Sequence, residues 1–430
     1  MGKQCRFESA LRSIALIFTA VLTLLLTACQ AAPDDGVIHL TLWQGVNPPT
    51  NRVVLQTLVD RFNQTHPQIQ VESLYAGQGD QQMPKILAAV VGKAQPDMLW
   101  FAPTITGQLV ELDAIRPIED WLDRSPLKDQ IDPALFESMQ WEGHTWSVPF
   151  GVNNVGIFYR PSLFEAAGIT QLPQTWEELR QVAKQLTTTN QHGMLLPLGK
   201  GEWSVFMWLS FLWSGGGELF ENSVPGAAHG RLNLETPAAA AALQLWQDLI
   251  RDGSAILSQP ERGYELDGFL AGKVAMQLTG PWTLGQLQPT GVDFDVMPIP
   301  AGVKPSTSIG GENLFILKTT PAREQAALVF AEYVLSEEFQ TEWAIGTGYL
   351  PVNLRSRQSP AYRKFVAEQP ALNVFLQQAQ QGRSRPIAPG YNRISDSLGR
   401  AIEAVVLEKS TSAEALAAAQ ERLNLILTIP

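Results

Sequence analysis

The chain has 430 residues and carries 31 basic and 42 acidic side chains, a net charge of −11 at pH 7. This acidic balance argues against a nucleic-acid partner, because proteins that bind phosphate backbones present clustered Lys and Arg. The length exceeds what one hydrophobic core usually supports, so we expect two domains.

The N-terminal segment has the features of a secretory signal. Lys3, Arg6 and Arg12 precede an apolar stretch from Ile14 to Leu26. A positive start followed by a short apolar run is typical of a signal peptide. The run is shorter than the roughly 20 residues that a membrane-spanning helix needs. A transmembrane anchor is therefore the weaker interpretation.

The apolar run ends at Leu26-Thr27-Ala28-Cys29, which resembles the lipobox of bacterial lipoproteins. The resemblance implies a signal peptide at residues 1–28, a lipid anchor on the sulfur of Cys29 and a tether at residues 29–36. Two or more acyl chains would hold the protein durably to a membrane face outside the cytoplasm. An ordinary signal cut near Ala32, with Cys29 incidental, is the alternative.

The first part of the mature chain alternates strand and helix patterns. Apolar residues alternate with polar ones over residues 38–42, the period of a strand, and a helical face follows over residues 54–62. Further strands are predicted at 69–76 and 96–103, with a helix at 83–92 between them. This alternation predicts a parallel sheet with helices on both faces, which binds ligands beyond the carboxyl ends of its strands.

The middle of the chain carries clear helix signals. Thr175 and Glu178 form a capping box that starts a helix running to about Leu186. Thr236 is an N-cap with Pro237 at the first helical position. Strands are predicted at 273–280, 294–300 and 313–318, and residues from 321 onward are predicted to be mostly helical.

Catalytic signatures are absent from the sequence. It has no metalloprotease motif, no nucleophile elbow, no complete phosphate-binding glycine loop and no cysteine nucleophile in the mature part. Its five histidines are scattered, so we expect no metal and no cofactor. Glu202, Asp267 and Glu312 leave open a carboxylate pair of the glycosidase type.

Several aromatic residues stand next to strand ends or helix starts. Trp282 follows Gly280-Pro281 after a predicted strand, and Trp43, Trp100 and Trp203 occupy similar positions. A pyranose ring has an apolar face and an equator of hydroxyls, and aromatic faces with fixed polar groups match it. For these four tryptophans, packing in the core is the alternative. Asp80 is either a ligand contact or a solvated helix N-cap.

Seven ordered segments resemble the family 1 extracellular solute-binding proteins of ABC importers, the group that binds maltose, trehalose and glycerol phosphate. The segments are "TLWQG", "KILAAVVGKAQPDMLWFAP", "VPFGVNNVGIFYRPSLFEAAGI", "LPQTWEELRQVAKQL", "AGKVAMQLTGPW", "SIGGENLFIL" and "WAIGTGYLPV". The resemblance extends from about Val37 to the end of the chain.

The resemblance implies an α/β fold of the two-lobed periplasmic-binding-protein type (type II), with each lobe a sheet flanked by helices. The first lobe would comprise 37–149 and 297–335, and the second 150–296 and 336–430. Ligand in the cleft between the lobes stabilises a closed form that docks on the ABC permease. We therefore expect a monomeric receptor that makes and breaks no bond.

The resemblance also implies a set of ligand-binding residues. Trp282 matches a sugar-stacking residue, Gly311 and Glu312 a ligand-lining pair, and Tyr349 a ligand contact. Relatives place an arginine before the last long helices, and Arg385 is the better match, with Arg393 in reserve. The expected ligand-binding residues are Trp43, Gln44, Asp80, Trp100, Asn153, Asn154, Trp203, Trp282, Gly311, Glu312, Tyr349 and Arg385.

An acidic chain rich in Trp suits a neutral disaccharide or a glycosylated polyol better than a phosphate dianion. Glycerol phosphate is the second expectation. A secreted carbohydrate-active enzyme that uses Glu202 or Glu312 as acid and base, and a purely structural lipoprotein, are the alternatives from other classes.

Overall fold

The computed structural model describes most of the chain after the predicted signal. The described residues are 36–199, 201–221, 231–259, 265–388 and 390–426. The predicted signal peptide, Cys29 and all but the last residue of the predicted tether lie outside them. Within these ranges, no helix combines the length and the apolar character that crossing a membrane requires.

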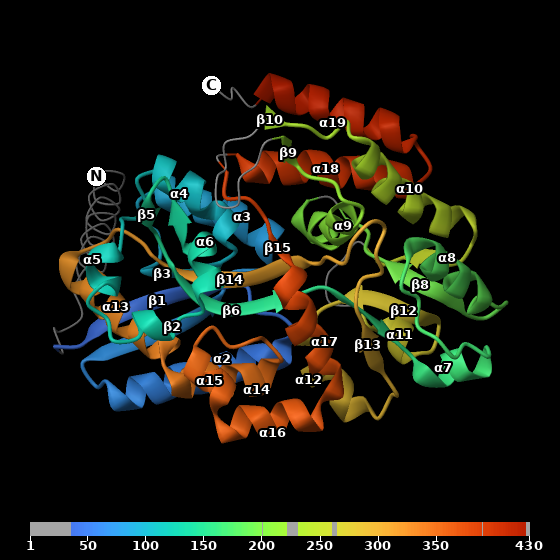
Figure 1. The fold of residues 1–430 in the computed structure, drawn as a ribbon. Coiled ribbons are helices and arrows are strands. Elements are labelled where there is room, and N and C mark those ends of the chain that lie inside the picture. The colour runs from blue at the N-terminus through green and yellow to red at the C-terminus, as the bar shows by residue number, and fades with distance from the viewer. Residues whose placement is uncertain (1–35, 200, 222–230, 260–264, 389, 427–430) are drawn as a thin grey trace, which may run out of the picture.

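The fold is built on two main β-sheets, which lie side by side in Figure 1. The first sheet has the order β15-β14-β3-β1-β2, with β6 paired to β14. Its strands are β1 (Ile38–Gln44), β2 (Ile69–Tyr75), β3 (Met98–Phe101), β6 (Val148–Asn154), β14 (Ser308–Ile316) and β15 (Arg383–Ser384). Strands β1, β2 and β3 are parallel, as the alternating pattern predicts, and β14 runs antiparallel to β3 and β6.

The second sheet has the order β11-β8-β12-β7-β13. Its strands are β7 (Gly156–Tyr159), β8 (His192–Leu196), β11 (Ala255–Leu257), β12 (Val274–Thr279) and β13 (Asp295–Met297). Strand β8 is parallel to β11 and β12, whereas β7 is antiparallel to β12 and β13. Two short hairpins lie outside these sheets, β4 (Gln140–Trp141) with β5 (His144–Thr145) and β9 (Phe220–Glu221) with β10 (Arg231–Leu232).

Helices surround both sheets (Figure 1). In chain order they are α2 (Pro49–Thr65), α3 (Gly79–Val91), α4 (Thr106–Glu111), α5 (Glu119–Leu122), α6 (Phe136–Met139), α7 (Pro161–Ala166), α8 (Trp176–Gln185), α9 (Glu202–Ser214), α10 (Pro237–Arg251), α11 (Asp267–Leu270), α12 (Leu284–Leu287), α13 (Pro321–Leu335), α14 (Glu337–Thr347), α15 (Leu354–Gln358), α16 (Pro360–Glu368), α17 (Pro370–Gln378), α18 (Tyr391–Val406) and α19 (Ser412–Ile426).

The helix starts follow the capping signals in the sequence. The predicted capping box of α8 is present, since Thr175 accepts from the backbone of Glu178 and the Glu178 carboxylate accepts from the backbone of Thr175. The hydroxyl of Thr236 accepts from the Ala239 N–H at 3.1 Å and starts α10. These caps satisfy N–H groups that a helix start leaves without intrahelical partners.

Two strands connect the sheets. Strand β6 of the first sheet ends at Asn154, and after Val155 alone the chain enters β7 of the second sheet. The Val155 N–H donates a hydrogen bond to the Thr307 hydroxyl at 3.2 Å, and the same hydroxyl donates to the Val155 carbonyl at 2.7 Å. The chain returns through β14, which pairs with β6 over almost its whole length.

We call the part built on the first sheet the first lobe and the part built on the second sheet the second lobe. The predicted lobe boundaries remain a proposal. Strand β6 stays in the first sheet as far as Asn154, beyond the predicted boundary at 149. Helix α14 begins after the predicted boundary at 335, yet it packs against α2, which covers the first sheet.

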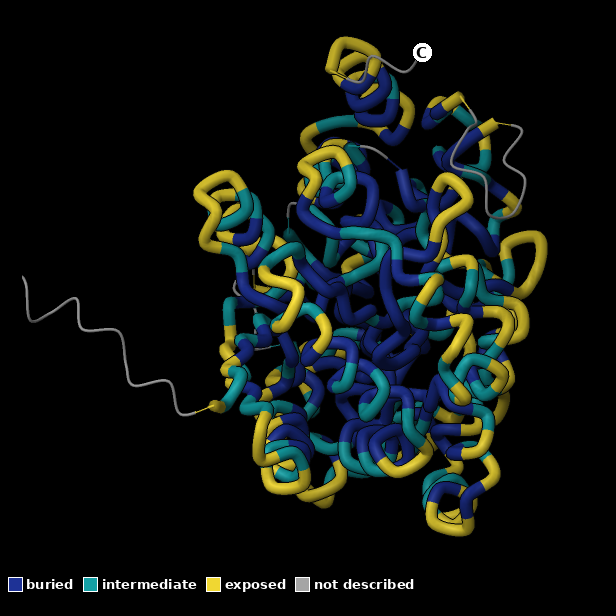
Figure 2. Tube along the Cα trace, turned by 90° about the vertical axis from the view of Figure 1, so that its left-hand side faces the viewer, coloured by how far each residue is buried: buried dark blue, intermediate teal, exposed yellow. Residues whose placement is uncertain are grey.

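The buried hydrophobic residues form one large core cluster and a smaller second one, and exposed positions lie mainly on helix exteriors and loops (Figure 2). Helix α9 is buried from Ser204 to Ser214, so its direction is fixed by packing on every side. Its N-terminal end, which carries Glu202 and Trp203, is only partly buried. This end points into the space between the lobes.

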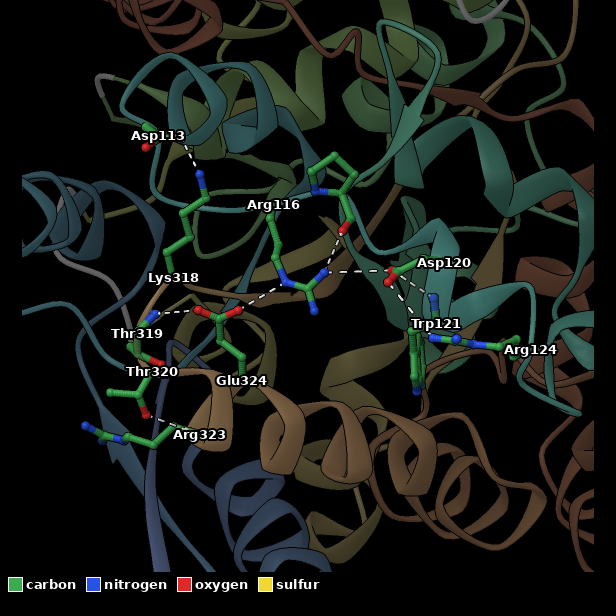
Figure 3. A network of polar contacts seen from close by, with 11 residues as sticks. Asp113, Arg116, Asp120, Trp121, Arg124, Lys318, Thr319, Thr320, Arg323 and Glu324 are labelled. Carbon is green, nitrogen blue, oxygen red and sulfur yellow. Dashed lines mark hydrogen bonds and ion pairs between the residues drawn. The ribbon is translucent and has the colours of Figure 1, made fainter.

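A network of polar contacts holds the chain where β14 leaves the first sheet (Figure 3). Glu324 of α13 accepts from Arg116 at 3.0 Å and from the Thr319 N–H at 2.9 Å. Lys318 pairs with Asp113 in the loop after α4. Ion pairs that solvent can reach each contribute little, but together these contacts fix one end of the strand that carries Gly311 and Glu312.

Candidate functional site

A cavity of about 410 Å³ lies between the two lobes. The first lobe lines it with residues at or after the ends of its parallel strands, with residues of β6 and β14 and with Tyr349. The second lobe lines it with the start of α9, the turn after β12 and the start of α18. The carboxyl ends of strands are where open α/β sheets bind ligands. The predicted residues that line it are Asp80, Trp100, Asn153, Trp203, Trp282, Gly311, Glu312, Tyr349 and Arg385.

One wall of the cavity is aromatic. The rings of Trp203 and Trp282 lie 6.0 Å apart at 65°, and Phe206 lies 6.4 Å from Trp282. Gly280 makes the position of Trp282 possible, because a Cβ atom there would lie 2.0 Å from the Trp282 Cζ3 atom. The Trp282 side chain is therefore folded back on its own turn, where it presents part of its surface to the cavity.

Three residues of the first lobe that line the cavity have buried polar atoms without partners in the described part of the chain. Gln82, Trp100 and Asn153 are at most 6 % exposed. Among the described residues, no partner is present for Gln82 Nε2, Trp100 Nε1 or Asn153 Oδ1. Buried polar groups normally have hydrogen-bond partners, because leaving one unpaired costs about 1–3 kcal/mol. The first-lobe lining thus contains two donor atoms and one acceptor atom that no described residue satisfies.

The carboxyl group of Glu312 lines the cavity beside Tyr349. The Tyr349 hydroxyl donates to Glu312 Oε2 at 3.2 Å. Removal from bulk water raises the pKa of Glu312 to about 7, although Arg385 and the Tyr349 hydroxyl favour its charged form. The same burial, together with the neighbouring carboxylate, raises the pKa of Tyr349 well above its usual value. Near neutral pH the Glu312 carboxyl can therefore either donate or accept a hydrogen bond.

A second polar cluster surrounds Arg385. Its guanidinium pairs with Glu202, and its central carbon lies 4.6 Å from the centroid of the Phe206 ring. Burial opposes its charged form, but Glu202 and the Tyr391 hydroxyl outweigh this and raise the pKa of Arg385. Glu202 also accepts from the Ser395 hydroxyl at 2.6 Å. The cluster brings together the starts of α9 and α18 and the segment after β15.

Asp80 lies in the first turn of α3, whose N-cap is Gln78. The predicted N-cap alternative is therefore wrong for α3. Asp80 instead accepts a hydrogen bond from the backbone N–H of Glu202 at 3.3 Å, across the cavity. Asp80 therefore accepts from the first residue of a helix, but that helix is α9 of the second lobe and not its own helix α3.

Three predicted residues do not line the cavity. Strand alternation turns Trp43 away from the cavity, and its side chain packs against the smaller core cluster, which includes Ile86 of α3. Gln44 is 4 % exposed and accepts from the Val46 N–H at 2.8 Å. Asn154 donates to the Phe375 carbonyl at 2.9 Å and accepts from Gln378. All three serve packing, so we remove them from the proposed site.

The reserve arginine also lies elsewhere. Arg393 is exposed, and its Nη1 donates to the Ile426 carbonyl at 2.9 Å on α19. Arg385 is thus the arginine that reaches the cavity. Across the described part of the chain, no three His, Cys, Asp or Glu side chains come together in a group that could hold a metal ion.

Sequence reasoning missed several lining residues. Phe206 lies one helical turn after Trp203 on α9, and this i, i+3 spacing was the signal that could have found it. Tyr391 and Ser395 are spaced i, i+4 on α18 and also line the cavity. No local signal shows that the start of α18 faces the first lobe.

A sequence profile of the bacterial extracellular solute-binding protein family matches residues 57–372. The chain belongs to this family. The profile match confirms the predicted family, and residues on both lobes fall within it. As the family's description says, its members are extracellular solute-binding proteins.

Two relatives of this solute-binding protein are named for different ligands. It is 22 % identical over 448 residues to the sn-glycerol-3-phosphate-binding periplasmic protein UgpB of Pectobacterium atrosepticum, covering 98 % of both chains. It is 21 % identical over 385 residues to the maltotriose-binding protein of Pyrococcus abyssi, covering 87 % of this chain and 78 % of that protein.

Among solved structures, the binding protein is similar to the GacH receptor of Streptomyces glaucescens, solved unliganded and in complex with acarbose. The TM-score is 0.81 at 21 % identity, and the match covers 91 % of this chain and 98 % of that chain. At this identity the likeness concerns the fold. It confirms the predicted two-lobed α/β architecture.

Proposed function

We propose that this protein is the receptor of an ABC importer and captures a neutral disaccharide or a glycosylated polyol between its lobes. Trp203, Trp282 and Phe206 offer flat apolar faces to the C–H groups of a sugar ring. The Glu312 carboxyl and Asn153 offer fixed polar groups to its hydroxyls. Closure of the lobes over the ligand creates the form that the permease subunits recognise, and no bond of the ligand is made or broken.

The observation that carries this proposal is the pairing of an aromatic wall with buried, unpartnered polar atoms in one cavity. An apolar ligand would leave Gln82, Trp100 and Asn153 unsatisfied, and a small ion would leave the tryptophan faces unused. A saccharide uses both. The maltotriose-binding relative and the acarbose-binding GacH receptor support the same ligand class.

Glycerol phosphate is the second candidate. The UgpB relative spans nearly the whole chain, and the cavity contains an arginine, Arg385. The charge balance of the cavity, which has more carboxylates than cations among its described lining residues, favours the neutral ligand.

Calorimetry and thermal unfolding test the proposal. The full chain is solubilised in a detergent that has no sugar headgroup and titrated with disaccharides, glucosyl-polyols, monosaccharides and glycerol phosphates. A ligand at about 100 times its dissociation constant adds about 2.7 kcal/mol to the free energy of unfolding. A shift with a neutral sugar class supports the proposal. A shift with phosphates alone selects the second candidate, and turnover of an oligosaccharide would identify an enzyme instead.

We also propose that Cys29 carries the lipid that keeps the receptor beside its transporter. The apolar run and the lipobox-like segment before Cys29 support this. Replacing Cys29 by Ser should move the protein from the membrane fraction to the soluble fraction, with ligand affinity unchanged. Retention of the variant in the membrane fraction would contradict the anchor. Elution of the released protein at the volume of a monomer would support the proposed monomeric state.

A further inference from the structure

The side chains that line the cavity carry more negative than positive charge. Among the described lining residues, the carboxylates are those of Asp80, Glu202, Glu312 and Asp396, and Arg385 is the single cation. An anionic ligand that enters this cavity therefore meets an unfavourable field unless Arg385 is free to bind it.

Arg385 is already engaged inside the protein. Its side chain is 8 % exposed and pairs with Glu202, whose side chain is 25 % exposed. The Phe206 ring covers the guanidinium at 4.6 Å from the ring centroid. These contacts hold the guanidinium in one place and neutralise its charge.

Glu202 is held as firmly as its partner. The Ser395 hydroxyl donates to one carboxylate oxygen at 2.6 Å, and the Tyr391 hydroxyl donates to the other at 3.4 Å. Glu202 is also the first residue of α9, where a helix start favours negative charge. A phosphate that took Arg385 from Glu202 would leave this carboxylate partly buried without its cation, which is unfavourable.

We infer that Glu202 is a specificity-determining residue that excludes anionic ligands, because it occupies the arginine that a phosphate group would need. The inference rests on the proposed function for the location of the site and deepens it by assigning to one residue the choice between neutral and phosphorylated ligands. Relatives that bind phosphates and relatives that bind sugars would then differ in whether this arginine is free.

The test compares the wild-type chain with Glu202→Gln in a detergent that has no sugar headgroup. Glutamine keeps the side-chain length and an oxygen that can accept from Ser395, but it does not neutralise Arg385. Dissociation constants are measured by calorimetry for glycerol 3-phosphate, inorganic phosphate, maltose and trehalose. We expect no measurable phosphate binding by the wild type and a gain of about 10- to 100-fold in phosphate affinity for Glu202→Gln.

Two controls isolate the ion pair. Asp396→Asn removes one negative charge from the same cavity but leaves the Arg385–Glu202 pair intact, since Asp396 pairs with Arg400 at 2.8 Å. It should change phosphate affinity less than about threefold, as expected for an exposed charge. The double variant Glu202→Gln/Arg385→Gln should lose the gain, because it lacks the freed cation.

Three results would overturn the inference. They are phosphate binding by the wild type as tight as its sugar binding, an equal gain in Asp396→Asn, and no gain in a Glu202→Gln protein whose Tm shows it to be folded. The wild-type measurement needs no variant to fold. If no neutral sugar binds the wild type but Glu202→Gln gains phosphate, the proposed function fails and the inference stands. If the wild type binds a neutral sugar but Glu202→Gln gains no phosphate affinity, the proposed function stands and the inference fails.

Discussion

Asp80 and Glu202 meet across the cavity, with the Asp80 carboxylate 3.3 Å from the backbone nitrogen of Glu202, although 122 positions separate them in the chain. Asp80 belongs to α3 of the first lobe, and Glu202 begins α9 of the second. An acidic side chain satisfies an N–H that a helix start leaves open and interacts favourably with the helix dipole. A direct hydrogen bond between protein groups therefore joins the two lobes at the cavity.

Replacing Asp80 by Ala should loosen this junction. Without the acceptor, we expect a larger radius of gyration by X-ray scattering and a loss of ligand affinity worth about 0.5–2 kcal/mol, the range of a lost helix cap. Asp80→Asn is the matched control, because its side-chain oxygen can still accept and its loss should be smaller. Identical scattering curves for Asp80→Ala and the wild type would contradict the prediction.

Gly280→Ala tests the aromatic wall without removing a ring. The new Cβ would lie 2.0 Å from Trp282 Cζ3, so the ring must move, whereas the extended backbone at φ −132° accepts Ala. We expect a loss of sugar affinity worth about 1–3 kcal/mol, similar to Trp282→Ala. Gly268→Ala, where the nearest side-chain atom is 3.6 Å away, should leave sugar affinity unchanged. If Gly280→Ala bound sugar as tightly as the wild type, Trp282 would serve packing and would not contact the ligand.

Glu312→Gln should change how stability depends on pH. The pKa of Glu312 rises from 4.5 to about 7 on folding, so the folded state holds the proton more tightly. This group therefore lowers the free energy of unfolding as pH rises from about 4.5 to about 7, with no further loss above that window. Without ligand, the variant should be more stable than the wild type by about 1–3 kcal/mol at pH 8.

The advantage of Glu312→Gln should shrink toward zero near pH 4, where the wild-type carboxyl is protonated in both states. Denaturant unfolding at several pH values measures it. Glu111→Gln changes the same chemical group on the exposed surface of α4 and serves as the control. A difference that does not vary with pH would show that Glu312 does not titrate as we expect.

Gly311→Ala should destabilise the strand crossing below the cavity. Gly311 has φ +124°, and a Cβ atom there would lie 2.1 Å from the Gly151 carbonyl oxygen of β6. Backbone strain and the clash together should cost about 2–4 kcal/mol in unfolding free energy. Gly285→Ala, in a helix with its nearest neighbour at 3.6 Å, should stay within about 1 kcal/mol of the wild type. Equal stability of both variants would contradict this account.

Local sequence patterns predict much of the fold. The capping box of α8 and the Thr236 cap of α10 act within a few residues, so their signals stand alone in the sequence. Strand β14 is longer than predicted because it begins at Ser308 and includes two glycines, which weaken the strand pattern. At Gly311 the neighbouring strand leaves no room for a side chain, because a Cβ atom there would lie 2.1 Å from the Gly151 carbonyl oxygen of β6.

The site was only partly predictable. Strand alternation alone shows that Asn153 and Asn154 cannot both face the cavity, and the structure turns Asn153 inward. The pair of Arg385 with Glu202 joins residues 183 positions apart, and neither position has a local pattern that points to the other. Such pairs depend on how the lobes and the C-terminal helices pack, which single-sequence periodicity does not contain.

The passage from β6 to β7 through Val155 alone has a consequence for the order in which the chain can fold during synthesis. The first sheet needs β14 between β3 and β6, and β14 ends at Ile316, after every strand of the second sheet has been made. Strands β1, β2 and β3 can pair with one another early, but β3 must wait for β14, which emerges some 200 residues later. A nascent chain of this protein can complete its second sheet first, and the outer edge of β3 stays unpaired until β14 emerges.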